Sequence, residues 1–287
     1  MKKTLIIMLL FLLPVSLANA NYTVRKDIVF KQVGDKTLAL DLYLPTVTKT
    51  QPAPLLIWVH GGAWKRGSKD AIPTKNPRLL NSFLERGYAL ASVDYRLSGE
   101  ATFPAPVADI NDALNYLYEK AAQYQVDANK VVLMGRSAGG HLAGLVGALN
   151  THKEVGFISS PNYQVAAVVS FFGPTDLLAL GNKGNKKASA KSSVSRFLGG
   201  IPSDIPDVAI EASTTTYIGA DSPAYILLHG DEDKRVPHSQ SELLKAKLDE
   251  FGVENALYIE KGVGHSADVF DSPKYVPTVV SFVGKYL

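Results

Sequence analysis

The segment at residues 131–149 carries the clearest chemical signal in the chain. The apolar run Val-Val-Leu-Met leads into Gly-Arg-Ser-Ala-Gly at residues 135–139, and a helix-compatible stretch follows. A strand-to-helix turn of this kind exposes the hydroxyl of Ser137, and its glycines stand where Cβ atoms would clash. The amino terminus of the next helix favours negative charge near it. The pattern indicates a nucleophilic serine for acyl transfer, and an ordinary turn is the alternative interpretation.

A second motif could supply the hydrogen-bond donors that acyl transfer to such a serine needs. The apolar run at residues 55–59 ends in His-Gly-Gly-Ala-Trp at residues 60–64. A loop of this kind exposes backbone N–H groups, and the tetrahedral oxyanion of ester hydrolysis requires such donors. The candidate donors are the N–H groups of Gly62, Ala63 and Ala138. A glycine turn without function explains this motif alone, but not the two motifs together.

The two motifs together resemble those of the α/β-hydrolase superfamily. Within it, the chain is similar to the hormone-sensitive-lipase-type esterases and to the feruloyl- and acetyl-xylan-esterase-like group. The resemblance extends over residues 25–287 and includes Asp-Tyr-Arg-Leu at 94–97, Phe-Pro-Ala-Pro at 103–106, His-Gly-Asp-Glu-Asp at 229–233, Val-Pro at 236–237 and Gly-His at 264–265. Lipases of the hormone-sensitive type usually have a glycine where this chain has Ala63, and alanine keeps the backbone donor.

The resemblance implies a partner acid and a base downstream of Ser137, in the order serine, acid, histidine. It assigns the acid to Asp233, in the loop after the apolar run at residues 224–228, with Asp231 as the alternative. A loop past a strand end is where an acid can reach a histidine. The base is His265, whose neighbouring glycines let the loop approach the sheet edge, because an imidazole suits general-base work near neutral pH.

Two aromatic residues are candidates for contact with substrate. Trp64 follows the expected oxyanion donors, and Phe172 follows an expected strand at residues 165–171. Either ring can line an acyl or aryl pocket. Phe171 and Phe172 fit the hydrophobic core equally well.

Alternating strand and helix patterns position these motifs. Residues 37–44 place leucine at every second position, which predicts a half-buried antiparallel strand. Continuous apolar runs predict parallel strands buried on both faces, at residues 55–59, 89–93, 131–134, 165–171, 224–228 and 256–259. Helical spacing is found at residues 111–122, 239–251 and 276–287. We expect an α/β-hydrolase fold with a mostly parallel sheet of about eight strands and helices on both faces.

Residues 180–195 break this pattern. They are rich in lysine, serine and glycine and show little apolar periodicity. This composition predicts a flexible basic surface loop within a single domain at residues 21–287. The alternatives are a lid over the site or a patch for an acidic polysaccharide.

The first twenty residues are expected to be a secretory signal peptide. Two lysines precede the apolar run at residues 5–13, and Ala-Asn-Ala at 18–20 has the form of a cleavage site. Pro14 interrupts the run too early for a membrane span. The chain has no cysteine, so neither a disulfide nor a lipid-bearing cysteine is expected. We therefore expect an exported protein, periplasmic or extracellular, without a membrane anchor.

Composition and charge exclude several classes of protein. A hydrophobic content of 46% argues against disorder and against a coiled coil. The net charge is only +3, and no run of Lys and Arg is dense enough to bind a phosphate backbone. Nucleic-acid binding is therefore disfavoured. The glycine-rich segments lack the nucleotide-binding patterns, and no His or Cys pair has metal-ligand spacing. No cofactor and no metal are expected.

The sequence thus predicts an exported serine carboxylesterase that hydrolyses short-chain or aryl esters, of acetyl or feruloyl type, through an acyl-enzyme. The ester is expected on a small molecule or on a polysaccharide. An amide-cleaving relative, such as a peptidase or formamidase, is one alternative, since the machinery is shared. A non-catalytic binding protein with the same fold is the other, although such proteins usually lose the serine or the histidine.

Overall fold

The computed structural model describes residues 22–47, 52–152, 155–182 and 189–287. Its strands are β1 (Tyr22–Val33), β2 (Lys36–Pro45), β3 (Ala53–Val59), β4 (Ala89–Val93), β5 (Val126–Arg136), β6 (Gln164–Phe171), β7 (Ala224–Gly230) and β8 (Asn255–Glu260). Its α-helices are α1 (Ile72–Lys75), α2 (Pro77–Leu84), α3 (Ala105–Glu119), α4 (Ala121–Tyr124), α5 (Ala138–Leu149), α6 (Leu177–Gly181), α7 (Ser193–Leu198), α8 (Pro206–Glu211), α9 (Ser239–Glu250) and α10 (Val276–Val283), with 3-10 turns η1 (Lys69–Ala71) and η2 (Thr214–Tyr217). The expected leader at residues 1–20 lies outside the described residues.

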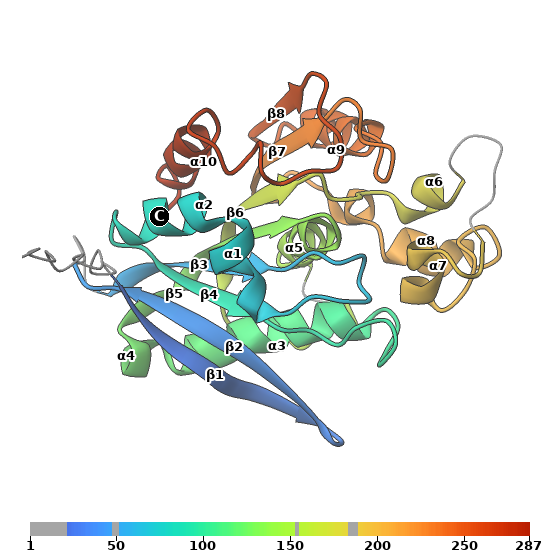
Figure 1. Ribbon diagram of the computed structural model, residues 1–287. Coiled ribbons are helices and arrows are strands. Elements are labelled where there is room, and N and C mark those ends of the chain that lie inside the picture. The colour runs from blue at the N-terminus through green and yellow to red at the C-terminus, as the bar shows by residue number, and fades with distance from the viewer. Residues whose placement is uncertain (1–21, 48–51, 153–154, 183–188) are drawn as a thin grey trace, which may run out of the picture.

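The eight strands form one sheet in the order β1-β2-β4-β3-β5-β6-β7-β8. The pairs β1–β2 and β2–β4 are antiparallel, and all pairs from β4 to β8 are parallel. Figure 1 shows the sheet with the antiparallel hairpin of β1 and β2 at one edge and β8 at the other. The predicted α/β-hydrolase architecture, a mostly parallel eight-stranded sheet with helices, is confirmed.

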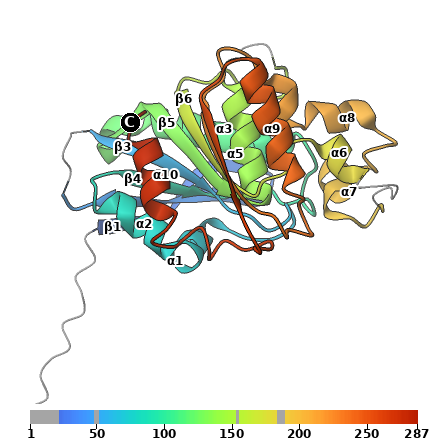
Figure 2. The same ribbon diagram turned by 90° about the horizontal axis from the view of Figure 1, so that it is seen from above.

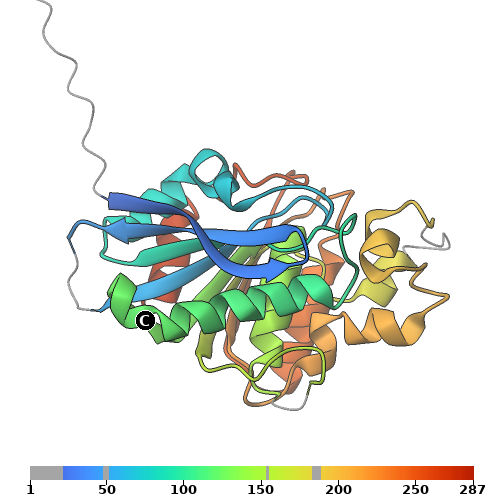
Figure 3. The ribbon, with the colours of Figure 1, turned by 90° about the horizontal axis from the view of Figure 1, so that it is seen from below.

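The parallel strands are buried on both faces, as their continuous apolar sequences predict. In β3, Leu55, Ile57 and Val59 belong to the core that includes α3, α5 and α9, whereas Leu56 and Trp58 belong to the core that includes α2 and α10. Figures 2 and 3 show these two groups of helices on opposite faces of the sheet. Side chains alternate along a strand, so a strand covered on both faces has no polar side.

Three elements differ from the expectation. Strand β2 is antiparallel as predicted, but it is not open to solvent on its second face, because Asp41 is wholly buried and ion-paired with Lys69 at 2.9 Å. Strand β1 was not expected, since half of its residues are polar and they interrupt the apolar pattern. Helix α3 begins at Ala105 rather than near residue 111, because proline is tolerated in the first turn of a helix.

The register of the parallel strands brings their carboxyl ends to one edge of the sheet. Val59 pairs with Gly135, and Phe171 pairs with both Arg136 and Leu228. The loops that follow β3, β5, β6 and β7 therefore leave the sheet side by side. Open α/β sheets bind ligands at this edge.

Candidate active site

Ser137 lies at the sharp turn between β5 and α5. Its φ of 51° and ψ of −124° are strained for a residue with a side chain, and its N–H donates to the carbonyl of Phe171 at 2.8 Å. A Cβ at Gly135 would lie 2.3 Å from the carbonyl oxygen of Gly139, and a Cβ at Gly139 would lie 2.1 Å from that of Val59. Only glycine fits either position. The turn and the two glycines take the form that the sequence predicts.

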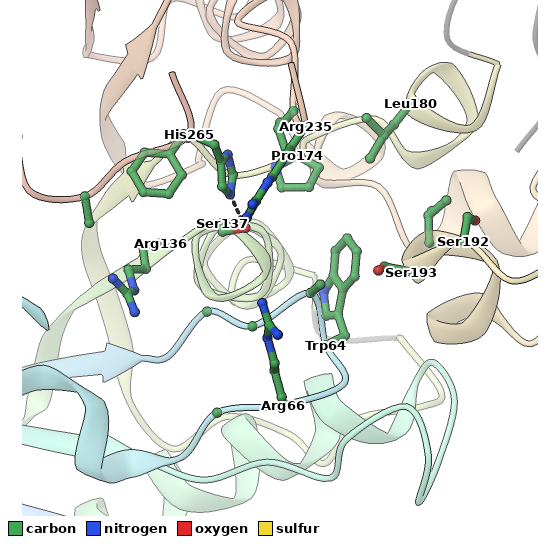
Figure 4. A pocket seen from close by; sticks show the side chains of 18 of the residues that line it. Trp64, Arg66, Arg136, Ser137, Pro174, Leu180, Ser192, Ser193, Arg235 and His265 are labelled. Carbon is green, nitrogen blue, oxygen red and sulfur yellow. Dashed lines mark hydrogen bonds between the residues drawn. The ribbon is translucent and has the colours of Figure 1, made fainter. Parts of the chain in front are cut away.

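The structure brings Ser137, His265 and Asp233 into one hydrogen-bonded chain. The Nε2 atom of His265 is 2.9 Å from Ser137 Oγ, and its Nδ1 atom is 2.6 Å from Asp233 Oδ2. An ionised carboxylate can only accept, so Nδ1 carries the proton and Nε2 presents a lone pair to the serine. Figure 4 shows the contact between His265 and Ser137 at the centre of the pocket. These are the three positions that the sequence analysis selected.

Asp233 is held as a carboxylate by its surroundings. Burial alone would raise its pKa, but hydrogen bonds from His229, His265 and the backbone N–H of Val236 hold the pKa of Asp233 well below its usual range. The backbone N–H groups of Arg235 and Val236 donate to Oδ1 at 2.8 and 2.9 Å. The side chain therefore has a fixed orientation and charge.

Asp231, the alternative acid, has no hydrogen bond to His265 in the described part of the chain. Its Oδ1 atom accepts the backbone N–H of Gly262 at 2.6 Å. This contact ties the loop after β7 to the loop that carries His265. Asp231 thus supports the neighbouring loop, and Asp233 occupies the position next to the imidazole.

His229 is a residue of the site that sequence reasoning missed. It is wholly buried, and its Nε2 atom is 2.9 Å from the carbonyl of Val236 and 3.3 Å from Asp233 Oδ2. Its Nδ1 atom is 2.8 Å from Ser241 Oγ in α9. The carbonyl fixes the proton on Nε2, which then also points at Asp233. A signal was present, since His229 and Asp233 are four residues apart in one turn.

The loop after β3 carries the expected oxyanion donors. Gly62, Ala63 and Trp64 all have positive φ, of 132°, 56° and 57°. Within the described part of the chain, no hydrogen bond from the backbone N–H of Gly62, Ala63 or Ala138 is found. Backbone donors that face a nucleophile without an internal partner are suited to a developing oxyanion.

The ring of His60 packs beneath the backbone of the loop after β3 and supports it. Its ring stacks on Tyr95 with centroids 4.3 Å apart, and Nδ1 is 2.8 Å from the carbonyl of Gly61. Burial lowers the pKa of His60 to about 4, so the ring is neutral near pH 7. The neutral ring supports the backbone of the loop and takes no part in the hydrogen-bonded chain of Ser137.

Trp64 and Phe172, the two aromatic candidates for contact with substrate, both border the pocket. The indole N–H of Trp64 donates to His141 Nδ1 at 3.2 Å, and its ring stacks on Phe197 at 4.8 Å. Phe172 packs edge-on against the His265 ring, with centroids 4.7 Å apart. Phe171 and Phe172 are 1% and 3% exposed, and both belong to the core on the face of α2 and α10. Phe172 therefore also holds the imidazole in place, a role that the sequence did not indicate.

The site lies in a pocket of about 930 Å³. Its lining includes the apolar side chains of Trp64, Phe172, Pro174, Leu180 and Val194 and the basic side chains of Arg66, Lys75, Arg136 and Arg235. Figure 4 shows Trp64, Leu180, Ser192 and Ser193 on one side of Ser137 and Arg136 on the other. This size suits a small-molecule or saccharide ligand.

The ends of the expected loop at residues 180–195 are ordered parts of this pocket. Leu180 and Gly181 close helix α6, and Ser192 caps α7 by accepting the N–H of Ser195 at 3.1 Å. Figures 1 and 2 show α6, α7 and α8 grouped at one end of the molecule. These ends are walls of the site rather than a solvated loop, because short capped helices need little apolar periodicity. Residues 183–188 lie outside the described residues.

In the described ranges, no group of three or more His, Asp or Glu side chains is arranged to hold a metal ion. No helix in the same ranges has the length and apolar character to cross a bilayer.

The chain is similar to known esterases. The family model BD-FAE matches residues 40–248. Esterase LipQ of Mycobacterium tuberculosis (strain ATCC 25618 / H37Rv) is 31% identical over 247 residues, which are 84% of this chain and 56% of LipQ. The probable isoprenylcysteine alpha-carbonyl methylesterase ICMEL1 of Arabidopsis thaliana is 28% identical over 86% of this chain and 52% of its own. The chain spans little more than half the length of these two relatives.

Solved structures agree with the fold. A truncated form of a carbohydrate esterase from gut microbiota superposes with a TM-score of 0.82 and 27% identity, over 94% of this chain and 98% of that one. The resemblance to α/β-hydrolase esterases that the motifs indicated is confirmed. With its family model matched across the sheet and the serine turn, the chain belongs to the BD-FAE family.

Proposed function

We propose that this protein is a serine carboxylesterase that cleaves short-chain or aryl esters, of acetyl or feruloyl type, through an acyl-enzyme. The observation that carries the proposal is the continuous chain Ser137 Oγ to His265 Nε2 at 2.9 Å and His265 Nδ1 to Asp233 Oδ2 at 2.6 Å. It stands in a pocket beside backbone N–H groups that have no partner in the described part of the chain.

Each group has a place in the two half-reactions. His265 Nε2 takes the proton of Ser137 as Oγ attacks the ester carbonyl, and Asp233 stabilises the imidazolium that forms. The N–H groups of Gly62, Ala63 and Ala138 hold the oxyanion. His265 then protonates the leaving alcohol. Water, deprotonated by the same nitrogen, attacks the acyl-enzyme, and the acid and free serine are released.

The substrate class draws on the pocket and on the relatives. The apolar wall formed by Trp64, Leu180 and Val194 suits a short acyl chain or an aryl group. The names of the similar proteins, an esterase, a methylesterase and a carbohydrate esterase, share ester cleavage and differ in the alcohol released. Ester hydrolysis is therefore the common element, and the carbohydrate esterase favours a saccharide as the alcohol.

The decisive experiment compares wild type with Ser137→Ala on p-nitrophenyl acetate and on the matching acetanilide. Wild type is expected to cleave the ester much faster than the anilide, and the variant should lose about 10³-fold or more in kcat/KM. A fluorophosphonate should label wild type and not the variant. Faster anilide cleavage would assign an amidase, and a folded wild type without labelling or turnover would assign a binding protein.

We further propose that residues 1–20 direct export and are removed. Support comes from the two lysines, the apolar run and Ala-Asn-Ala at residues 18–20. Mass spectrometry of the protein from the producing cells should give a mature amino terminus at Asn21. An intact leader on protein retained inside the cell would contradict this proposal.

A further inference from the structure

The catalytic pocket is bordered by basic side chains and by no acidic one among the described residues. Arg66, Lys75, Arg136 and Arg235 all line it. The whole chain has 30 Lys and Arg against 27 Asp and Glu, so an even distribution would place both signs around a pocket of this size. The concentration of positive charge is a property of this site and not of the protein as a whole.

Each of the three arginines is attached to a different part of the catalytic machinery. Arg136 immediately precedes Ser137 in the turn after β5. The backbone N–H of Arg235 donates to Asp233 at 2.8 Å. The backbone of Arg66 packs on the oxyanion loop so closely that a Cβ at Gly62 would lie 1.9 Å from its carbonyl oxygen. The backbones of the three arginines are therefore anchored to the segments that carry the reacting groups.

Figure 4 shows how these side chains are directed. Arg66 and Arg235 extend toward the centre of the pocket from opposite sides, and Arg136 extends on the side away from Trp64 and Leu180. Arg136 thus lies on the side of Ser137 away from Trp64 and Leu180, whereas Arg66 and Arg235 lie nearer the middle of the view. An acyl group against the apolar wall would leave the alcohol portion of an ester among the arginines.

None of the three guanidinium groups has a carboxylate partner within 4.0 Å among the described residues. Arg136 is partly buried, and this burial lowers its pKa, while Asp268 acts on it only from beyond ion-pair distance. By contrast Arg96, away from the pocket, is paired with Asp109 at 2.7 Å. A partly buried cation such as Arg136 is costly without a partner unless a ligand supplies the anion, whereas Arg66 and Arg235 are exposed and cost little when unpaired. The planar guanidinium group of arginine can donate two parallel hydrogen bonds to a carboxylate.

We propose that the natural substrate is an ester whose alcohol portion carries carboxylates, namely an O-acetylated saccharide built from uronic acid units. Three arginines spread around one pocket fit several spaced carboxylates better than one compact anion. Hydrolysis adds water across the ester, breaks the bond between the acyl carbon and the sugar oxygen, and releases acetate and the free hydroxyl. This inference rests on the proposed esterase activity and adds the charge of the substrate.

The test uses a matched pair of substrates and the enzyme that begins at Asn21. O-acetylated oligogalacturonides are compared with the same oligosaccharides after their carboxylates are reduced to alcohols, with acetate release as the assay. The ratio of kcat/KM, charged over reduced, is expected to exceed about 10, mainly through KM, since charge-assisted contacts are strong. The ratio should fall toward 1 as salt rises from about 20 mM to 300 mM, because exposed charges are screened.

The variants Arg66→Gln and Arg235→Gln should each lower this ratio about threefold, and the double variant should bring it close to 1. Arg66→Lys should recover part of the ratio. Arg86→Gln is the matched control, because Arg86 is exposed and does not line the pocket, and its ratio should equal that of wild type. Arg136 is left in place, since its backbone belongs to the serine turn.

The outcomes separate this inference from the proposed function. If p-nitrophenyl acetate is cleaved through Ser137 but the charged and reduced oligosaccharides react equally, the esterase stands and the anionic substrate is wrong. An unchanged ratio in the double variant would also overturn it. If no ester is cleaved by the folded enzyme, the proposed function fails and this inference fails with it.

Discussion

His229 and Asp233 form a buried pair, with His229 Nε2 at 3.3 Å from Asp233 Oδ2. The same nitrogen is 2.9 Å from the carbonyl of Val236, and Ser241 contacts the other side of the ring at 2.8 Å. The acid of the site is thus held by a second histidine as well as by His265. This second contact helps to keep the pKa of Asp233 low, and so keeps the carboxylate charged.

Replacing His229 should therefore affect turnover more than substrate binding. His229→Phe keeps a ring but loses the contacts with Asp233, Val236 and Ser241. We expect it to lower kcat about 10- to 100-fold with little change in KM. Ser241→Ala is the matched control, since it removes only the contact remote from Asp233, and its kcat should fall far less. Steady-state kinetics on p-nitrophenyl acetate measure both. A folded His229→Phe enzyme with wild-type kcat would show that His265 and the backbone suffice to hold Asp233.

The two aspartates of the loop after β7 should behave differently. Asp233→Asn can no longer balance the imidazolium or select the right tautomer, and kcat should drop about 10³- to 10⁴-fold. Asp231→Asn loses only an acceptor for Gly262 N–H and should retain most of its kcat. Circular dichroism of both variants checks that the fold is intact. Equal losses in the two variants would mean that the acid has been misassigned.

The serine turn should not tolerate a methyl group. A Cβ at Gly139 would lie 2.1 Å from the carbonyl of Val59, which is part of a central strand and cannot move away. Gly139→Ala should therefore lower the free energy of unfolding by about 3 kcal/mol or fail to fold. Gly99→Ala is the control, since nothing lies within 4 Å of its added Cβ. Urea unfolding of the two variants decides the matter, and similar stabilities would contradict the close approach of the two segments.

Acid should destabilise the protein through two buried histidines. Burial lowers the pKa of both His60 and His141 to about 4. The folded state keeps the rings neutral while the unfolded chain binds protons below about pH 6.5, so their contribution is present above pH 6.5 and is lost as pH falls toward 4. The expected loss is about 3 kcal/mol for each ring over that range.

His141→Gln should remove one of these two losses. The variant's free energy of unfolding should fall by about 3 kcal/mol less than that of wild type between pH 7 and pH 4. Leu142→Ala, a change at the adjacent buried position, should lower stability at every pH without altering the pH dependence. Urea titrations at several pH values provide the measurement. A wild-type pH dependence in His141→Gln would show that this ring is not neutral in the folded state.

Much of this site could be predicted because its residues have strict local requirements. The spacing of Gly135, Ser137 and Gly139 is set by one turn, and glycine at both ends is imposed by contacts of 2.1 to 2.3 Å. The order of Asp233 and His265 follows from the family's strand order, and both lie in loops at the same sheet edge. The constraints on the serine turn act within a few residues, so they are visible in the sequence, whereas Asp233 and His265 were assigned through the family resemblance.

Other features could not be predicted because they arise from contacts between distant segments. Strand β1 is polar along much of its length and is a strand because it pairs with β2. The ends of residues 180–195 are walls of the pocket because helices α6 and α7 pack at the sheet edge. Phe172 contacts His265 only because β6 and the last loop meet there.

The amino-acid sequence by itself determined the alternation of strands and helices and the serine turn, because local backbone geometry and burial on both faces dictate residue types. Asp233 and His265 were expected from the resemblance to α/β-hydrolases, with Asp231 as the alternative acid. The tertiary structure alone decided that His229 supports Asp233 and that three arginines surround the nucleophile. Distances and charges between loops depend on how the sheet brings strand ends together, and no spacing along the chain records them.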